Sequence, residues 1–200
     1  RMVPHYRVPF FGALAERSDV ELVVVHGGES DVPGHPAQAG ELPFNSYLAP
    51  WRAGSFVGLN YVMQPGSLRA LRSEAPDVVV AEGTFSIVTN LFLALRCRFS
   101  TTRFLWWVGG WERPELTSWR RGLLRAYIRF ALRLADGFIA YGSAAREYLI
   151  GLGARPSRIR VAQNSIDAEG ILANLSRYRS EADRLRGAMG LTGRGVVLTV

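Results

Sequence analysis

The sequence predicts an α/β fold in which helices cover both faces of a parallel β-sheet. Short apolar runs recur along the chain, and stretches of about ten or more residues with helical periodicity separate them. Strands and helices that alternate in this way form right-handed crossover units, which place their strands parallel in one sheet. The clearest run, FLWWV at 104–108, shows no alternation with polar residues, so we expect a buried interior strand.

The other elements are predicted in order from the same patterns. A helix comes first, after the proline-rich start, with its apolar face at Val8, Phe11, Leu14 and Ala15. Besides 104–108, we expect strands at 20–25, 44–48, 56–63, 77–81, 137–141, 159–162 and 196–200. Of these, 44–48 and 56–63 carry the weakest signal. Further helices are expected at 65–74, from Thr84 or Ser86 to about 96, and at 115–135, 143–152 and 181–189.

Composition limits the class of protein. Hydrophobic residues make up 48% of the 200 residues and charged residues 20%, as in an ordinary globular protein. The net charge of +7 comes from 24 basic and 17 acidic residues, and all the basic residues are arginine, which suits phosphate and anionic headgroups. A single cysteine, Cys97, excludes an internal disulfide. No apolar run approaches the roughly 18 residues of a membrane span, so we expect a cytoplasmic protein.

The common catalytic motifs are absent from the sequence. It contains no Walker loop, no GxGxxG after a strand, no GxSxG elbow and no HExxH. The three histidines, His5, His26 and His35, lack the spacing of metal ligands, so we expect no metal.

Candidate site residues follow the ends of the predicted strands, where an open parallel sheet binds its ligands. They are His26, Glu82, Gly109, Gly110, Trp111, Glu112, Arg113, Tyr141, Gly142, Ser143 and Asn164. Gly109 and Gly110 would let the backbone come close to a ligand. An equal alternative is a Gly-Gly turn in which Trp111 packs on the core and its charged neighbours are solvated.

One long segment resembles a known family. ADGFIAYGSAAREYLIGLGARPSRIRVAQNSID, at 135–167, is similar to the stretch that closes the N-terminal domain of glycosyltransferase family 4 enzymes. The stretches HYRVPFFGALAER, PDVVVAEGT and WVGGWER resemble acceptor-side loops of members that build lipopolysaccharide, capsule or exopolysaccharide.

The resemblance implies a GT-B fold of two Rossmann-like domains that face a cleft. It implies an acceptor domain at 1–168 without the family's first strand, then a linker and the start of the donor domain at 169–200. The implied activity is retaining transfer of a sugar from a nucleotide-sugar donor to a saccharide or lipid-linked acceptor, with no cofactor. Many members have a histidine in the loop after 104–108, whereas this sequence has Gly109 and Gly110.

The resemblance also suggests roles for individual residues. The acceptor side would comprise Tyr6, Arg7, Glu82, Gly109, Gly110, Trp111, Glu112 and Arg113. Trp111 would stack on a sugar ring, and Glu112 is the only candidate for a catalytic group. The part of the cleft nearer the donor would comprise Tyr141, Gly142, Ser143 and Asn164. Alternatively, Glu82 only favours a helix dipole, and Ser143 is a helix N-cap, which is the stronger interpretation for Ser143.

The predicted helix at 115–135 carries a basic stripe. Its members recur at every fourth residue: Arg121, Arg125, Arg129 and Arg133. The opposite side is expected to hold Leu123, Ala126, Tyr127, Phe130, Ala131 and Leu134. We expect the stripe to face an anionic membrane, which would make the protein peripheral on the inner face of the cell membrane. The alternative is a solvated or ion-paired face.

Two other classes of function stay open. One is a non-catalytic saccharide- or nucleotide-binding module, and the other is an unrelated regulatory or epimerase-like domain, because a doubly wound sheet does not by itself imply catalysis. A donor domain with two paired glutamates would distinguish the enzyme from both. Nucleic acid is not an expected partner.

Overall fold

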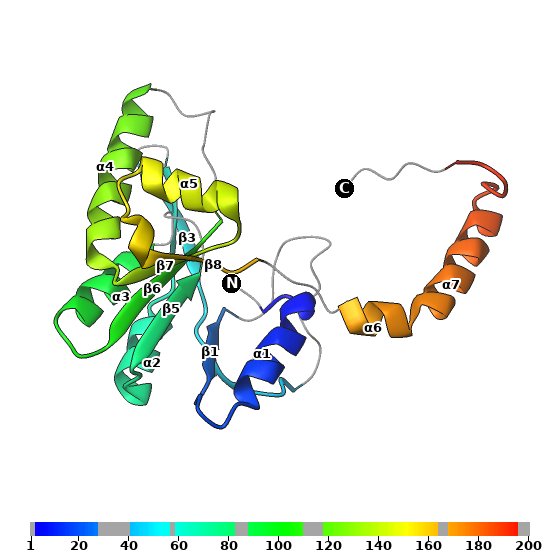
Figure 1. The fold of residues 1–200 in the computed structure, drawn as a ribbon, viewed down its shortest axis with the longest axis horizontal. Coiled ribbons are helices and arrows are strands. Elements are labelled where there is room, and N and C mark those ends of the chain that lie inside the picture. Colours follow the sequence, from blue (N-terminus) through cyan, green and yellow to red (C-terminus); the bar gives the residue numbers. More distant parts are fainter. Residues whose placement is uncertain are drawn as a thin grey trace. The chain divides into compact units, whose positions relative to one another are not determined.

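A four-stranded parallel sheet forms the centre of the fold (Figure 1). The computed structural model describes residues 3–27, 41–56, 59–82, 88–109, 118–163 and 168–195. The strands lie in the order β5 (Val78–Glu82), β6 (Arg103–Val108), β7 (Gly137–Ala140) and β8 (Ile159–Val161). Between them run α3 (Val88–Arg98), α4 (Ser118–Leu134), α5 (Ser143–Gly151) and the short helix η2 (Pro156–Arg158). This architecture confirms the predicted fold class.

The packed core lies between one face of this sheet and α3, α4 and α5. From β5 to β8, each strand lies next to the one that precedes it in the sequence, always on the same side of it. Right-handed crossovers between such strands place all three helices on the same face of the sheet. Phe104 and Trp106 on β6 are fully buried against this layer, as is Ile128 on α4. Phe10 packs on the opposite face of the sheet, where its ring centroid lies 6.0 Å from that of Trp107.

The interior position of β6 is confirmed, but its two faces are not covered equally. Phe104, Trp106 and Val108 are buried, whereas Leu105 and Trp107 are only half-buried. Burial therefore alternates along this strand, although the sequence does not, because apolar residues also occupy the more exposed face of the sheet.

The N-terminal part of the chain adds a second, smaller parallel sheet. It begins with η1 (His5–Arg7) and α1 (Val8–Ala15), where the first helix was predicted. The two strands β1 (Val23–His26) and β2 (Asn45–Leu48) then pair in parallel. Phe11 of α1 packs edge-on against Phe44, with ring centroids 5.7 Å apart.

The strand expected at 56–63 is present over 59–63, where it forms part of an antiparallel hairpin whose other strand was not predicted. The hairpin consists of β3 (Arg52–Phe56) and β4 (Leu59–Met63). Gly54 pairs with Tyr61, and a Cβ at position 54 would lie 2.5 Å from the Tyr61 ring, so glycine makes room for that ring. The helix α2 (Gly66–Glu74) follows, as predicted.

The chain divides into two compact units, Arg1–Asn164 and Ser165–Val200. The second unit contains α6 (Ala168–Ala173) and α7 (Leu175–Ala188), and none of its described residues is buried. The helix expected from 181 begins at Leu175, since the arginine, leucine and glutamate of this stretch favour helix more than its serines oppose it. The expected strand at 196–200 lies outside the described residues. The identity of the second unit as the start of a donor domain stays a prediction.

Candidate functional site

Three side chains gather on one face at the carboxyl edge of the sheet. Glu82, the last residue of β5, pairs with Trp107 on β6. Trp107 pairs with Ile139, and Tyr141 follows two residues later on the same side, because side chains along a strand alternate. The Tyr141 amide donates to the Val108 carbonyl at 3.2 Å, which extends the pairing to the strand end. The ring centroids of Trp107 and Tyr141 lie 5.4 Å apart.

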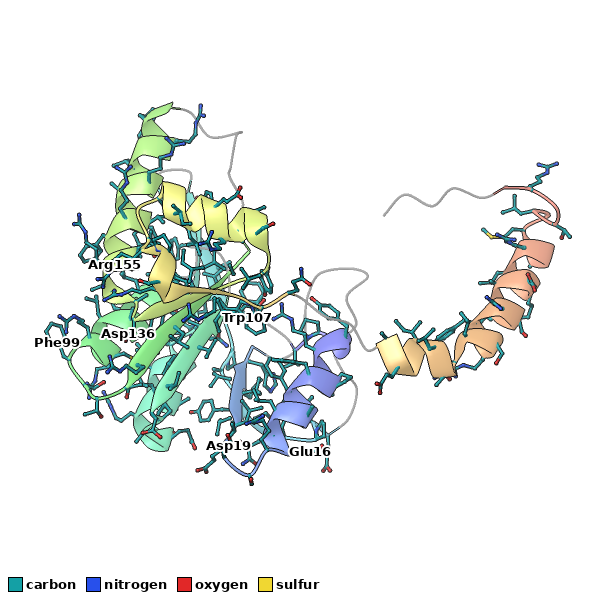
Figure 2. All side chains as sticks on the ribbon, in the orientation of Figure 1. Glu16, Asp19, Phe99, Trp107, Asp136 and Arg155 are labelled. Atoms are coloured by element: carbon teal, nitrogen blue, oxygen red, sulfur yellow. The ribbon has the colours of Figure 1, made fainter. Side chains whose placement is uncertain are left out.

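Arg7, from η1, covers these three side chains. Its Nη1 atom lies 2.5 Å from Glu82 Oε2, and its Nη2 atom donates to the Tyr141 hydroxyl at 2.5 Å. The Tyr141 hydroxyl in turn donates to Glu82 Oε1 at 2.6 Å. The guanidinium carbon lies 4.9 Å from the centre of the Trp107 ring, and Figure 2 shows Trp107 between the sheet and α1. We call Arg7, Glu82, Trp107 and Tyr141 the Arg7 cluster.

The cluster holds a charged arginine out of water. Arg7 is only 5% exposed, whereas the Glu82 side chain is 39% exposed. Burial by itself would lower the pKa of Arg7, but the negative charge of Glu82 and the hydrogen bond to Tyr141 raise it, so the guanidinium stays charged. Burial, with the adjacent Glu82 carboxylate, also raises the pKa of Tyr141. Tyr141 is therefore a neutral hydroxyl at physiological pH.

Three buried nitrogens of the cluster have no hydrogen-bond acceptor among the described residues. They are Nε and Nη1 of Arg7 and Nε1 of Trp107. The contact between Arg7 Nη1 and Glu82 is an ion pair without hydrogen-bond geometry. A buried donor without an acceptor costs about 1–3 kcal/mol, so an oxygen-rich ligand that reached these nitrogens would recover that energy.

Buried polar residues behind the cluster fix the end of β5. Asn90 on α3 donates to the Glu82 carbonyl at 3.3 Å and is almost completely buried. Next to it, Thr89 accepts the Gln64 amide at 2.6 Å, and the Gln64 side chain reaches the Ala49 carbonyl at 2.7 Å. These bonds connect α3 to the segments on either side of the hairpin.

The structure unites some of the predicted site residues. Arg7, Glu82 and Tyr141 meet directly, and Tyr6 lies beside them, with its ring 5.8 Å from the Arg7 guanidinium carbon. Gly109 and Gly142 directly follow β6 and Tyr141. The predicted residues that lie outside the described part of the chain are Gly110, Trp111, Glu112, Arg113 and Asn164.

Two expectations about individual residues need correction. Ser143 is the first residue of α5 rather than its N-cap, which is Gly142, and no side-chain hydrogen bond caps this helix. Trp107 was expected only as part of a buried strand, yet it forms the floor under Arg7. The position of Trp107 near the end of an apolar run, shortly before two glycines, could have indicated that it lies at the site.

The helix α4 exposes both charge and apolar surface. The four arginines of the stripe are exposed, as predicted. The expected apolar side is wrong in part, because Leu123 and Phe130 are 56% and 49% exposed and Ala126 is exposed too. The face that packs on the sheet is centred on Ile128 and Leu132 instead. Trp119, 54% exposed, adds a third large apolar side chain to the outer face. No helix in the described residues is long and apolar enough to cross a membrane.

The comparison with protein families identifies the fold around this site. Residues 10–165 match the family described as "Glycosyl transferase 4-like domain". The chain belongs to this family. A comparison with curated protein sequences found no match.

Solved structures of HepE from Anabaena (Alr3699) resemble this glycosyl transferase 4-like domain. The complex of HepE with UDP-glucose superimposes with a TM-score of 0.50 at 18% identity, over 76% of this chain and 38% of HepE. The complex with UDP gives 0.47 at 18% identity, over 74% and 37%, and the complex with UDP and glucose gives 0.46 at 17%, over 70% and 37%. The chain thus spans less than two fifths of the length of HepE, and the similarity to the UDP-glucose complex supports the fold.

Proposed function

We propose that this domain is the acceptor-binding half of a retaining glycosyltransferase. The enzyme would transfer a sugar from a nucleotide-sugar donor to a saccharide or lipid-linked acceptor, in the synthesis of a cell-surface polysaccharide or lipopolysaccharide. Membership of the glycosyl transferase 4-like domain family over residues 10–165 carries the proposal. HepE was crystallised with UDP and with UDP-glucose, so a uridine diphosphate sugar is the donor we propose to test first.

The Arg7 cluster is the proposed acceptor platform. Both carboxylate oxygens of Glu82 are held, one by Arg7 and one by Tyr141, while the side chain stays 39% exposed. A carboxylate fixed in this way accepts hydrogen bonds from sugar hydroxyls without first losing rotational freedom. The cluster also lies at the carboxyl edge of a parallel sheet, where such folds bind their ligands.

The loop after β6 would complete the acceptor side. In this proposal Trp111 stacks on a sugar ring, and Glu112 or Arg113 hydrogen-bonds its hydroxyls or a phosphate. Gly109 and Gly110 allow the loop to approach the acceptor. Gly142, Ser143 and Asn164 would lie nearer the donor, together with Tyr141. We expect the reaction to proceed without a metal or another cofactor.

The outer face of α4 is proposed to rest on an anionic membrane. The four arginines of the stripe would contribute about 1 kcal/mol each near such a surface. Trp119, Leu123 and Phe130 are exposed on the same helix and would enter the interface between headgroups and acyl chains. A peripheral position at the membrane would bring a lipid-linked acceptor to the cleft.

A transfer assay tests the function. The whole enzyme that contains this domain is incubated with UDP-glucose and a membrane lipid extract as acceptor, and release of UDP is followed together with incorporation of labelled glucose. We expect transfer that depends on the extract, with Glu82→Gln raising KM for the acceptor more than it lowers kcat. Binding of UDP-glucose without transfer to any acceptor would instead identify a binding module.

A further inference from the structure

We propose that the domain has a second site, a phosphate-binding cavity between α4, the end of α5 and η2. The cavity has a volume of about 590 Å³. Its lining includes four arginines and no acidic residue: Arg129, Arg133, Arg155 and Arg158. It lies beside Phe138, near the amino end of β7, whereas the Arg7 cluster lies at the carboxyl edge of the sheet. The proposal is therefore independent of the transfer reaction.

A tight turn brings the four arginines together. Gly153, two residues beyond the end of α5, lies in the left-handed region at φ +101°, which a side chain would disfavour. The amides of Gly153 and Ala154 then bond back to the carbonyls of Ile150 and Leu149, at 2.9 and 3.0 Å. The reversed chain carries Arg155 and η2 back against α4, and Figure 2 shows Arg155 beside that helix.

The cavity combines a charged rim with an apolar floor. The floor consists of buried side chains from α4, from β7 and from the turn after α5: Leu132, Phe138, Leu152 and Ala154. All four arginines on the rim are exposed, and within the described residues none forms an ion pair with a carboxylate. In the part of the chain that the structure describes, Arg158 is the one rim arginine with a protein hydrogen-bond acceptor, the Ala135 carbonyl at 3.4 Å from its Nη1 atom.

Helix dipoles account for only a small part of this charge. Both α4 and α5 end at the cavity, and each helix C-terminus is equivalent to about −0.5 elementary charge. Four guanidinium groups thus leave about three positive charges without a counter-charge. Like charges this close repel one another, so an anion that enters the cavity relieves the repulsion as well as forming its own hydrogen bonds.

Phosphate is the anion that fits these donors. Guanidinium groups bind phosphate oxygens through paired N–H bonds, and the volume and floor leave room for a carbon skeleton attached to the phosphate. Two sources share this chemistry, the headgroup of an anionic phospholipid and a soluble phosphate ester.

The test changes arginines that lie outside α4, so that binding in the cavity can be distinguished from binding to the outer surface of α4. The variant Arg155→Gln/Arg158→Gln is compared with Arg69→Gln/Arg72→Gln, which removes the same charge from exposed positions on α2. Binding of inorganic pyrophosphate is measured by titration calorimetry. Co-sedimentation is measured with vesicles of phosphatidylcholine that contain increasing phosphatidylglycerol.

We expect the cavity variant to lose affinity for one of the two probes by at least about tenfold, equivalent to about 1.4 kcal/mol, while the α2 control binds like the wild type. Weaker vesicle binding alone identifies a lipid headgroup as the ligand, and weaker pyrophosphate binding identifies a soluble phosphate. Equal behaviour of the cavity variant and the control with both probes overturns the proposal.

A charge-conserving variant provides a second test if the protein with both glutamine substitutions unfolds. Arg155→Lys/Arg158→Lys keeps both positive charges but loses the planar fork. It is expected to remain folded and to bind the same probe several times more weakly than the wild type, because paired bonds to phosphate are lost. Unchanged affinity for both probes in this variant also overturns the proposal.

Discussion

At the scale of single residues, the Arg7 cluster shows how a buried charge is kept in place. The guanidinium group of Arg7 is nearly inaccessible to water, and Glu82 supplies its counter-charge while Tyr141 bonds to both. Removing one member of a buried pair costs more than the pair itself is worth, because the remaining charge stays buried. The cluster should therefore contribute to stability as well as to binding.

Glu82→Gln should lower the free energy of unfolding by about 2–3 kcal/mol. This is less than the cost for a fully buried pair, because Glu82 is partly exposed. Tyr141→Phe removes a neutral hydroxyl and should cost about 1 kcal/mol. Urea denaturation of both variants measures these effects. A loss below about 0.5 kcal/mol for Glu82→Gln would mean that the pair behaves as a surface ion pair.

Tyr127→Phe should stabilise the protein by about 1 kcal/mol, since the Tyr127 hydroxyl is buried and has no hydrogen-bond partner in the described residues. Burial raises the pKa of Tyr127 from 10.0 to about 12. A raised pKa in the folded state gives stability that is complete below pH 10.0 and is lost as the pH rises toward 12.

Unfolding free energies at pH 7 and pH 11 test this prediction. The stability of the wild type should fall between these values more steeply than that of the Phe variant. A less stable Phe variant at pH 7 would show that the hydroxyl has an acceptor.

Trp111→Ala should reduce turnover with acceptor and leave Tm nearly unchanged, if Trp111 is a platform for a sugar ring. A tryptophan of the core would instead cost about 3–5 kcal/mol on truncation. Steady-state kinetics and a thermal melt of the same preparation distinguish the two roles. A large drop in Tm with normal acceptor kinetics would contradict the stacking role.

At the scale of elements, α4 presents two kinds of surface whose contributions to membrane binding can be separated by salt. Replacing Arg121, Arg125 and Arg129 with Gln should weaken binding to anionic vesicles at low salt, where charge acts over about 10 Å or more. Leu123→Ser with Phe130→Ser should weaken the binding that persists at 1 M salt, where charge is screened within about 3 Å.

Vesicle co-sedimentation at both salt concentrations measures these effects. The matched control for the arginine variant is the triple change of Arg69, Arg72 and Arg98 to Gln on α2 and α3. Equal binding by the wild type and both α4 variants would remove this helix from the membrane proposal.

At the scale of the whole molecule, the two parallel sheets have open edges. In the part of the chain that the structure describes, β5 pairs with β6 on one side and with no strand on the other. Val78 and Val80 on this edge strand are each 48% exposed. An unprotected edge strand of this kind is a template for pairing with another chain.

The 200-residue chain is therefore expected to self-associate through this edge strand. Size-exclusion chromatography with light scattering, together with a thermal melt, measures this. Val80→Lys should reduce association, because a charge on an edge strand opposes pairing. A monomer with a cooperative melt and dispersed amide resonances would contradict the prediction.

The sequence by itself determined the class of fold and the edge of the sheet where the Arg7 cluster, the proposed site, lies. Apolar runs that alternate with helical stretches specify a parallel sheet, because helical crossovers are the usual way to join parallel strands. The same logic places residues that follow strands, such as Glu82 and Tyr141, at one edge. The segment at 135–167 was also sufficient to suggest the family to which the chain belongs.

Only the tertiary structure decided which of these residues meet and which faces are covered. Arg7 and Tyr141 are 134 residues apart, and no local pattern specifies their contact, which depends on the order of the strands and the path of η1. The apolar residues on the outer face of α4 and the half-exposed position of Trp107 were likewise not predicted. Periodicity shows that a helix or strand has an apolar side, whereas the elements packed against it decide how much of that side is buried.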